Sequence, residues 1–405
     1  MKRVVILCVW LFSVVAGHAQ LSLDECRRLA RENYPEIRQY DLVHQTEQYN
    51  LSNAARAWIP QLAFSAQATW QTDAPNFPKE LTGMLAQQGL EIPGLRKDQY
   101  KVALELNQTI WDGGKSVADK RIARAEAAEQ KTMTDVDLYE LEGRVDDLYF
   151  GILLLDERIA QTNLTLNLLR SNLEKVRALQ RNGVAMQSDA DVLEAELLSV
   201  GQQLIQFESS CDSYRRMLGI FIGQKVGDRK LLRPSAVQPL SGESARPELA
   251  MFAAKIDRLM AQEKMVKSSS MPRLGFFAQG YYGYPGLDYM QSMMNSDWSW
   301  NAMLGVKLSW NFGAYYTQKN NLNKLRTSRQ QVEVQRDVFL FNMNLQAAQE
   351  NGDIARLRKA IADDDRIVAL RRSVREAAES KLRNGIIDTH DLLSKITDES
   401  TASMA

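Results

Sequence analysis

The sequence predicts a mainly helical protein with a small β part, in which long α-helical hairpins alternate with short amphipathic strands. Three observations support this fold class. Two long stretches lack proline and have helical periodicity, four short segments alternate apolar and polar residues, and the whole arrangement occurs twice within the 405 residues. A unit that repeats only twice has no continuous core of its own. We therefore expect the two halves to pack beside each other and against other chains.

The duplication is visible in short matches that keep their order along the chain. Tyr34-Pro35-Glu36 recurs as Arg246-Pro247-Glu248, and Arg181-Asn182-Gly183-Val184 recurs as Arg383-Asn384-Gly385-Ile386. Chance matches would not preserve such an order. We therefore divide the chain into a signal peptide (1–19), a first repeat (20–223), a linker (224–246) and a second repeat (247–405).

The first residues predict export. Lys2 and Arg3 precede an apolar run from Val4 to Val15, and small residues lead up to Ala19, after which we expect a signal peptidase to cut. The alternative is a transmembrane anchor, but the run is shorter than the ~20 apolar residues that a bilayer requires. A balanced formal charge of +0, without a block of Lys or Arg, argues against a nucleic acid partner.

Only Cys26 and Cys211 remain after the predicted cleavage. An oxidising compartment would permit a disulfide between them. They occupy unrelated positions in the two-fold repeat plan, however, so two separate thiols are the favoured interpretation.

The helices should be unusually long. Between Gly114 and about Leu179 there is no proline, and apolar residues follow a 3,4 spacing typical of a coiled coil. Gly183 and Gly385 are suited to the left-handed conformation that ends a helix, so the chain should reverse at each. The predicted helices of the first repeat cover 22–58, 114–181 and 187–222, and those of the second cover 247–270, 315–382 and 388–405. The last of these is truncated relative to its counterpart, since Ala405 falls in mid-helix.

Four segments alternate apolar and polar residues with the period of a β-strand: 60–72, 99–111, 273–284 and 300–312. Each is about as long as a tilted transmembrane strand and has one apolar and one polar face. For any single strand, a half-buried sheet in a soluble domain is the alternative interpretation.

Tryptophan placement favours a sheet in a membrane. The tryptophans beyond the signal peptide all lie at or near strand ends, as expected for aromatic girdles: Trp58, Trp70, Trp111, Trp298, Trp300 and Trp310. A barrel made by one chain needs about eight strands, and lipid tolerates no open sheet edge. Several copies of this chain would therefore have to share one barrel.

In this order and spacing, the features resemble the TolC family of outer membrane efflux proteins. The resemblance covers nearly all of the mature chain and includes the opening from Leu21 to Glu36, the Pro60-Gln61-Leu62 entry to a strand and the Trp111-Asp112-Gly113-Gly114 exit from the next. It implies a homotrimer whose subunits each give four strands to a shared 12-stranded barrel in the outer membrane, continued by an α-helical barrel across the periplasm. It also implies a passive exit duct for efflux or type I secretion, served by a periplasmic adaptor and an inner-membrane pump of the RND or ABC type.

The resemblance also points to site residues. The two helix turns, Asn182-Gly183-Val184 and Asn384-Gly385-Ile386, would contact the adaptor. Asp391 stands at the first of two positions where family members carry aspartates that narrow the periplasmic aperture, Ser394 stands at the second, and Ile387 replaces an arginine of some members. The alternative role of Asp391 is that of an ordinary helix N-cap or first-turn carboxylate.

We expect no enzyme activity and no cofactor. His44 and His390 are the only imidazoles beyond the signal peptide, neither lies at metal-ligand spacing from a cysteine, and no nucleophile or nucleotide-binding motif is present. We interpret the methionine-rich stretch 290–294 as a flexible surface loop. The competing function is a secreted coiled-coil structural or adhesive protein without a channel, which would leave the tryptophan placement unexplained.

Overall fold

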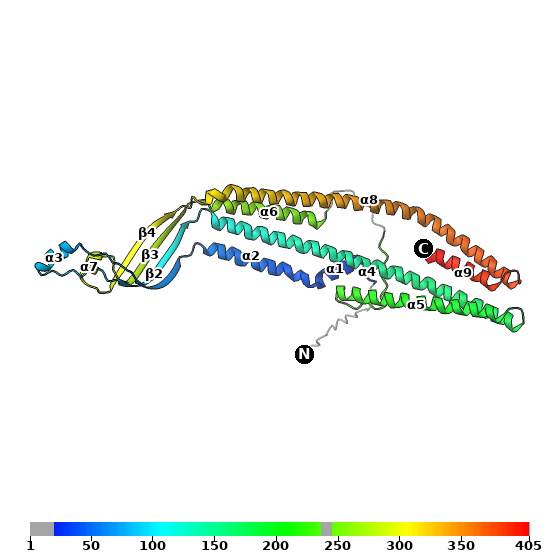
Figure 1. Cartoon of the computed structure of the whole chain (residues 1–405). Coiled ribbons are helices and arrows are strands. Elements are labelled where there is room, and N and C mark those ends of the chain that lie inside the picture. Colours follow the sequence, from blue (N-terminus) through cyan, green and yellow to red (C-terminus); the bar gives the residue numbers. More distant parts are fainter. Residues whose placement is uncertain (1–19, 236–244, 405) are drawn as a thin grey trace, which may run out of the picture. The chain divides into compact units, whose positions relative to one another are not determined.

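The computed structural model describes residues 20–235 and 245–404 (Figure 1). The predicted signal peptide, 1–19, lies outside the described residues. The elements follow the order α1 (Leu23–Asn33), η1 (Pro35–Arg38), α2 (Gln39–Arg56), β1 (Gln61–Trp70), α3 (Lys79–Gln87), β2 (Asp98–Trp111), α4 (Lys115–Arg181), α5 (Gln187–Ile222), α6 (Pro247–Ser268), β3 (Arg273–Tyr284), α7 (Tyr289–Met294), β4 (Ser299–Ser309), α8 (Ala314–Arg383) and α9 (Thr389–Met404).

The chain forms two compact units, and each draws on both halves of the duplicated sequence. The unit that we call the sheet unit comprises Gln39–Met133 and Glu248–Arg336. The second, which we call the hairpin unit, comprises, among the described residues, 20–38, 134–235, 245–247 and 337–404. The long helices α4 and α8 contribute to both units. Among the described helices, none is both long and apolar enough to cross a bilayer.

The four strands form one antiparallel sheet in the order β1-β2-β3-β4, which confirms the predicted small β part. Neighbouring strands pair in a regular register, apart from one shift between Thr109 and Trp111 of β2, so residues of one character form rows across the sheet. On one face Phe64 lies opposite Leu104, and Phe276 lies opposite Val306. These four side chains belong to an apolar face that is largely exposed in the single chain.

The opposite face of the sheet is polar. Gln67 lies opposite Lys101, and Glu105 lies opposite Gln279. The Lys101 ammonium donates to the Gln279 side-chain oxygen at 3.0 Å, and the Gln279 amide donates in turn to the Glu105 carboxylate. A hydrogen-bonded chain therefore crosses two strands on this face and satisfies both charged groups.

Helices of the sheet unit lie side by side in the same order as the strands they adjoin. Lys131 of α4 pairs with Glu47 of α2 at 3.6 Å, and Arg258 of α6 pairs with Glu129 of α4. Arg329 of α8 lies 3.8 Å from Glu263 of α6. The resulting order, α2-α4-α6-α8, matches β1-β2-β3-β4, so each strand continues into its own helix.

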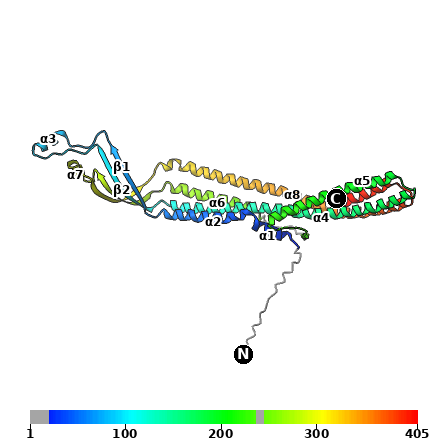
Figure 2. The same ribbon diagram turned by 90° about the horizontal axis from the view of Figure 1, so that it is seen from below.

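The hairpin unit contains two helical hairpins, α4–α5 and α8–α9, whose tips lie at the same end of the unit (Figure 2). The predicted coiled-coil seam of α4 is confirmed, because each of its residues is buried or half-buried: Val145, Leu148, Ile152, Leu155, Ile159, Thr162, Leu166, Leu169, Leu173 and Val176. Near the tips, α4, α5, α8 and α9 share one apolar cluster, which includes Leu169, Leu193, Ala378, Leu392 and Ile396.

Helix α1 packs on the other end of the first hairpin. Arg27 forms a two-pronged ion pair with Asp146 of α4, and the Asn33 amide donates to two carbonyl groups at the end of α5, each at 3.0 Å. The buried Tyr149 hydroxyl lies 2.7 Å from the carbonyl oxygen of Leu21 and 2.6 Å from that of Leu232. Tyr149 thereby connects the segment before α1 and the segment after α5 to α4.

The single helix predicted over 22–58 is wrong, because the structure has α1, η1 and α2 in its place. Pro35 has no backbone N–H to donate and disfavours helical backbone in the residue before it. Tyr34 is accordingly extended, with ψ 127°, and a short 3₁₀ turn separates the two α-helices.

The loop predicted at 290–294 is also wrong, since Tyr289–Met294 forms the short helix α7. Its N-cap is Asp288, whose carboxylate accepts a hydrogen bond from the Gln291 N–H at 3.0 Å. A second short helix, α3, was not predicted. It starts directly after Pro78, which has the backbone angle that suits a helix start.

Asp112 forms the turn between β2 and α4. Its carboxylate accepts hydrogen bonds from the N–H groups of Gly114, at 2.9 Å, and Ser116, at 2.7 Å, and from the Ser116 hydroxyl. Burial alone would raise the pKa of Asp112, but these hydrogen bonds outweigh it and hold the pKa below its usual range.

We expect Asp112→Ala to lower the free energy of unfolding by about 0.5–2 kcal/mol, because the start of α4 loses its acceptor. Asp112→Asn should retain most of the stability. Since the folded-state pKa is lowered, the charged Asp112 stabilises the fold at neutral pH, and this contribution is lost as the pH falls through the folded-state pKa. Thermal unfolding of the three proteins at neutral and acidic pH measures both effects. Equal stability of the wild type and the alanine variant at neutral pH would refute the capping role.

Candidate functional site

Both hairpin tips close with the same hydrogen-bond pattern. At the first tip the Val184 N–H donates to the Leu179 carbonyl at 2.9 Å, and at the second the Ile386 N–H donates to the Lys381 carbonyl at 3.0 Å. Gly183 and Gly385 have φ values of +75° and +69°, which is the left-handed conformation that the sequence predicts.

The two tips present small apolar side chains to solvent. Val184 is 70% exposed and Ile386 is 68% exposed. Met186, at the start of α5, is exposed as well. Each tip is therefore a hydrogen-bonded turn with an apolar side chain at its apex, which is a suitable contact for a partner helix.

Aperture candidates lie on the first turn of α9. The Asp391 N–H donates to the Asp388 carboxylate at 2.8 Å, so Asp388 caps this helix. Of the two alternative roles for Asp391, the N-cap is therefore wrong, whereas the first-turn carboxylate is confirmed. In the first hairpin the equivalent residue is Asp189, whose carboxylate accepts a hydrogen bond from the Met186 N–H at 2.8 Å. Asp391 is exposed on the first turn of α9, where the helix dipole favours a negative charge.

The other two aperture positions differ in exposure. Ser394 is exposed, whereas Ile387 packs against the apolar cluster beneath the tips. Ile387 therefore adds an apolar side chain to the core. Of Ile387, Asp391 and Ser394, only Asp391 has an acidic side chain.

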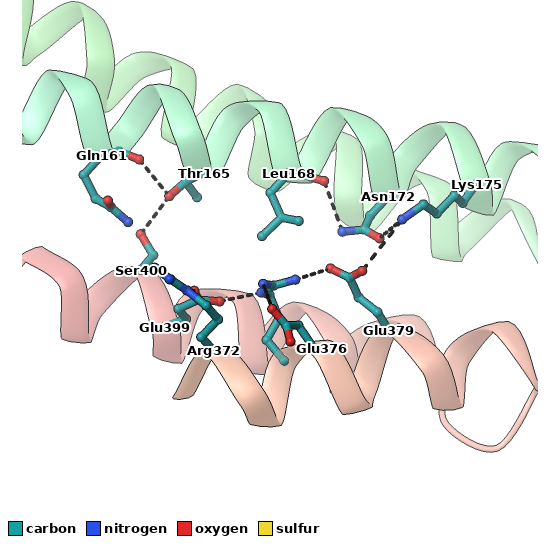
Figure 3. Close-up of polar contacts among 11 residues, drawn as sticks. Gln161, Thr165, Leu168, Asn172, Lys175, Arg372, Glu376, Glu379, Glu399 and Ser400 are labelled. Atoms are coloured by element: carbon teal, nitrogen blue, oxygen red, sulfur yellow. Dashed lines mark hydrogen bonds and ion pairs between the residues drawn. The ribbon is translucent and has the colours of Figure 1, made fainter. Parts of the chain in front are cut away.

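Behind the tips, a group of charged side chains joins three helices (Figure 3). Arg375 of α8 donates to Glu399 of α9 and to Glu379 of its own helix, each at 2.5 Å. Glu379 lies 3.8 Å from the Lys175 ammonium of α4. Sequence reasoning missed this group. A comparison of the two repeats would have revealed it, because Arg375 and Glu399 of the second repeat stand where the first repeat has leucines.

The tryptophans form two rows at opposite ends of the sheet. Trp70 lies opposite Asp98, Trp300 lies opposite Tyr282, and Trp298 stacks on Tyr100 with ring centroids 5.7 Å apart. At the other end, Trp111 lies opposite Leu274, and the rings of Trp58 and Trp310 flank the start of β1 and the end of β4. All six indoles are exposed in the single chain.

The described residues hold no group of three or more His, Cys, Asp or Glu placed to bind a metal ion. Cys26 and Cys211 are both buried and free, which confirms the interpretation as two separate thiols. Burial raises the pKa of Cys26 to about 12, so this thiol is a poor nucleophile at neutral pH.

Comparison with known proteins agrees with this geometry. Residues 27–223 match the model of a family described as outer membrane efflux protein. No curated protein matches the chain.

Solved structures share the fold of almost the whole chain. The outer membrane protein VceC from Vibrio cholerae is 14% identical, with a TM-score of 0.67 over 94% of this chain and 90% of that one. The outer-membrane channel OprN is 13% identical, with a TM-score of 0.69 over 94% and 85%. The CmeC outer membrane channel of Campylobacter jejuni is 15% identical, with a TM-score of 0.65 over 94% and 81%. At these identities the likeness establishes a shared fold. It confirms the predicted fold class, a mainly helical protein with a small β part.

Gly183→Val and Gly385→Val should each lower the free energy of unfolding by roughly 1–2 kcal/mol, because valine resists the left-handed conformation. A Cβ atom at either glycine would meet nothing within 4 Å, so the loss should come from the backbone alone. The matched control is Gly143→Ala in the middle of α4, where a Cβ is also unobstructed. It should stabilise the protein by about 0.5–1 kcal/mol. Thermal unfolding that ranks all three variants alike would rule out strained turns.

Proposed function

We propose that this chain, whose residues 27–223 match the outer membrane efflux protein family, is the outer membrane channel of a tripartite efflux or type I secretion system. In this role it is a passive exit duct. An inner-membrane pump, of the RND or ABC type, supplies the substrate and the energy, and a periplasmic adaptor joins pump and channel. The proposal includes export of the chain by a cleaved signal peptide.

The observation that carries the proposal is the two-faced, open sheet. Its exposed face presents large apolar side chains, among them Leu304, which is 76% exposed. Its other face carries the Lys101–Gln279–Glu105 chain of hydrogen bonds. A sheet with lipid on one side and water on the other requires this division. A secreted coiled-coil protein has no use for such an exposed apolar face, so we regard that alternative as less favoured.

The open edges of the sheet support a homotrimer. The outer edges of β1 and β4 have no partner within the described sheet, and lipid does not tolerate such edges. Three copies would supply twelve strands, and neighbouring subunits would cover these edges.

The hairpin tips are the proposed contact with the adaptor. The residues concerned are Asn182, Gly183, Val184, Asn384, Gly385 and Ile386. Their support is geometric, since both turns close with the same hydrogen bond, lie at one end of the hairpin unit and place an apolar side chain at the apex. The strained Gly183→Val and Gly385→Val turns should still permit a trimer but should impair efflux, because Val184 and Ile386 would be displaced.

Orientation of the sheet can be tested by placing arginine on each face. Leu104→Arg and Val306→Arg put a charge at mid-strand on the apolar face, and each should cost about 2–4 kcal/mol and reduce assembly. Asn107→Arg is the matched control on the polar face and should be tolerated. Heat-labile oligomers on native gels, after extraction of outer membranes, report assembly. Equal assembly of all three variants would exclude the proposed orientation.

The aperture role of Asp391 can be tested by single-channel recording. If three copies of Asp391 converge on the threefold axis, their charge favours cations over anions at the closed end. Asp391→Asn should therefore weaken cation selectivity, and Ser394→Asp, which adds a second acidic ring, should strengthen it.

The matched control for this experiment is Asp189→Asn at the equivalent position of the first hairpin, which should leave selectivity unchanged. Because Asp388 already caps α9, the Asp391→Asn variant keeps its helix start. Unaltered selectivity in both the Asp391 and the Ser394 variants would remove the aperture from the proposal.

A further inference from the structure

The two hairpins of the hairpin unit are built alike, but they differ in one layer. Gly183 and Gly385 are equivalent positions of the two repeats. At the same sequence offset, Leu173 corresponds to Arg375 and Leu197 corresponds to Glu399. Leu173 is buried in the apolar cluster and Leu197 packs against it. The side chains of Arg375 and Glu399 are each only 12% exposed. A leucine layer of the first hairpin thus corresponds to a nearly buried ionic layer in the second.

The charges in this layer satisfy one another. The Arg375 Nε donates to one oxygen of Glu399, and a second nitrogen of Arg375 donates to Glu379. The other oxygen of Glu399 accepts a hydrogen bond from Arg372 at 3.2 Å. We call Arg375, Glu379 and Glu399 the Arg375 cluster. A buried guanidinium with two carboxylates at 2.5 Å is a strong, directional arrangement.

The same layer reaches across to the first hairpin (Figure 3). Glu379 lies 3.8 Å from Lys175 of α4, and Lys175 donates to the side-chain oxygen of the fully buried Asn172 at 3.4 Å. Ser400 follows Glu399 on α9, and its hydroxyl lies 3.2 Å from the hydroxyl of Thr165 on α4. The C-terminal half of α9 therefore has polar contacts to both α8 and α4.

Apolar burial on α9 is concentrated in its N-terminal half. Leu392 and Ile396 are its fully buried hydrophobic residues, and both precede Glu399. Beyond Ile396 the contacts to α8 include Arg371 with Asp398, at 2.8 Å, and the Arg375 cluster. Packing alone therefore accounts for the start of α9 but not for the position of its second half.

We propose that the Arg375 cluster fastens the C-terminal half of α9 to α8 and, through Lys175, to α4. The second hairpin is thus held by ion pairing where the first is held by leucine packing. Removing one charge of a buried ion pair leaves its partner uncompensated, whereas replacing both with apolar residues is often neutral. The repeat itself supplies the apolar replacement, because leucine occupies both equivalent positions of the first hairpin.

Amide hydrogen exchange on the full, detergent-solubilised protein tests this proposal. Arg375→Leu and Glu399→Leu should each accelerate exchange in the second half of α9 by at least about tenfold. The double variant, Arg375→Leu with Glu399→Leu, leaves the Glu379 carboxylate paired with the Lys175 ammonium at 3.8 Å. It should therefore return exchange to within about threefold of the wild type. Exchange in α5 should remain unchanged in all three proteins, because α5 is held by leucines.

Arg177→Ala is the matched control, because the Arg177–Glu194 pair joins α4 to α5 at a similar distance, 2.6 Å, but both side chains are about half exposed. This variant should leave exchange unchanged. A single leucine variant that loses protection throughout the hairpin unit has unfolded more widely. In that case Glu399→Gln, which keeps the shape of the side chain and removes its charge, should be used instead. Unchanged exchange in α9 of the single variants, or a double variant as unprotected as the singles, would overturn the proposal.

Discussion

Backbone hydrogen bonding at the edges of one small sheet constrains the rest of this protein. Strands β2 and β3 are paired on both sides, whereas β1 and β4 are each paired on one side only within the described chain. Every residue of β1 is exposed. An apolar sheet with unpaired edges is unstable in water and costly in lipid, because free N–H and C=O groups find no partner there. Association of several copies resolves both problems at once.

Continuity from strand to helix extends this constraint beyond the sheet. Each strand is joined at one end to a helix of the sheet unit: α2 and α6 precede β1 and β3, and α4 and α8 follow β2 and β4. The ion pairs between these helices follow the strand order. The junctions are tight. A Cβ atom at Gly113, which has φ +70°, would lie 2.7 Å from the Cβ of Met271 at the neighbouring junction. Sheet and helices are therefore held in a common order, so subunits that complete the sheet also bring exposed helical faces together.

The elements that depend on local pattern were predictable from the sequence. Alternation located the four strands, the seam from Val145 to Val176 located the buried face of α4, and Gly183 and Gly385 located the reversals. Short-range backbone effects were harder to predict. The break at Pro35 lies within an otherwise helical pattern, and α7 depends on a single capping side chain, Asp288.

The site was predictable only in part, because its side chains come together from distant parts of the chain. The turn glycines act through their own backbone, so their conformation followed from residue type. Asp388, rather than Asp391, caps α9, and both acids are equally plausible caps when read from spacing alone. The Arg375 cluster depends on the packing of α9 against α8, and on a helix surface Arg375 and Glu399 resemble ordinary solvated charges until that packing is known.

The mass of the intact particle tests the central claim most directly, namely that one chain contributes only part of a shared membrane barrel. The protein should be extracted from outer membranes in detergent, and native mass spectrometry should then count its subunits. We predict a particle of three mature chains that dissociates on heating and requires detergent to remain soluble. A monomer that stays soluble and folded without detergent would contradict the account.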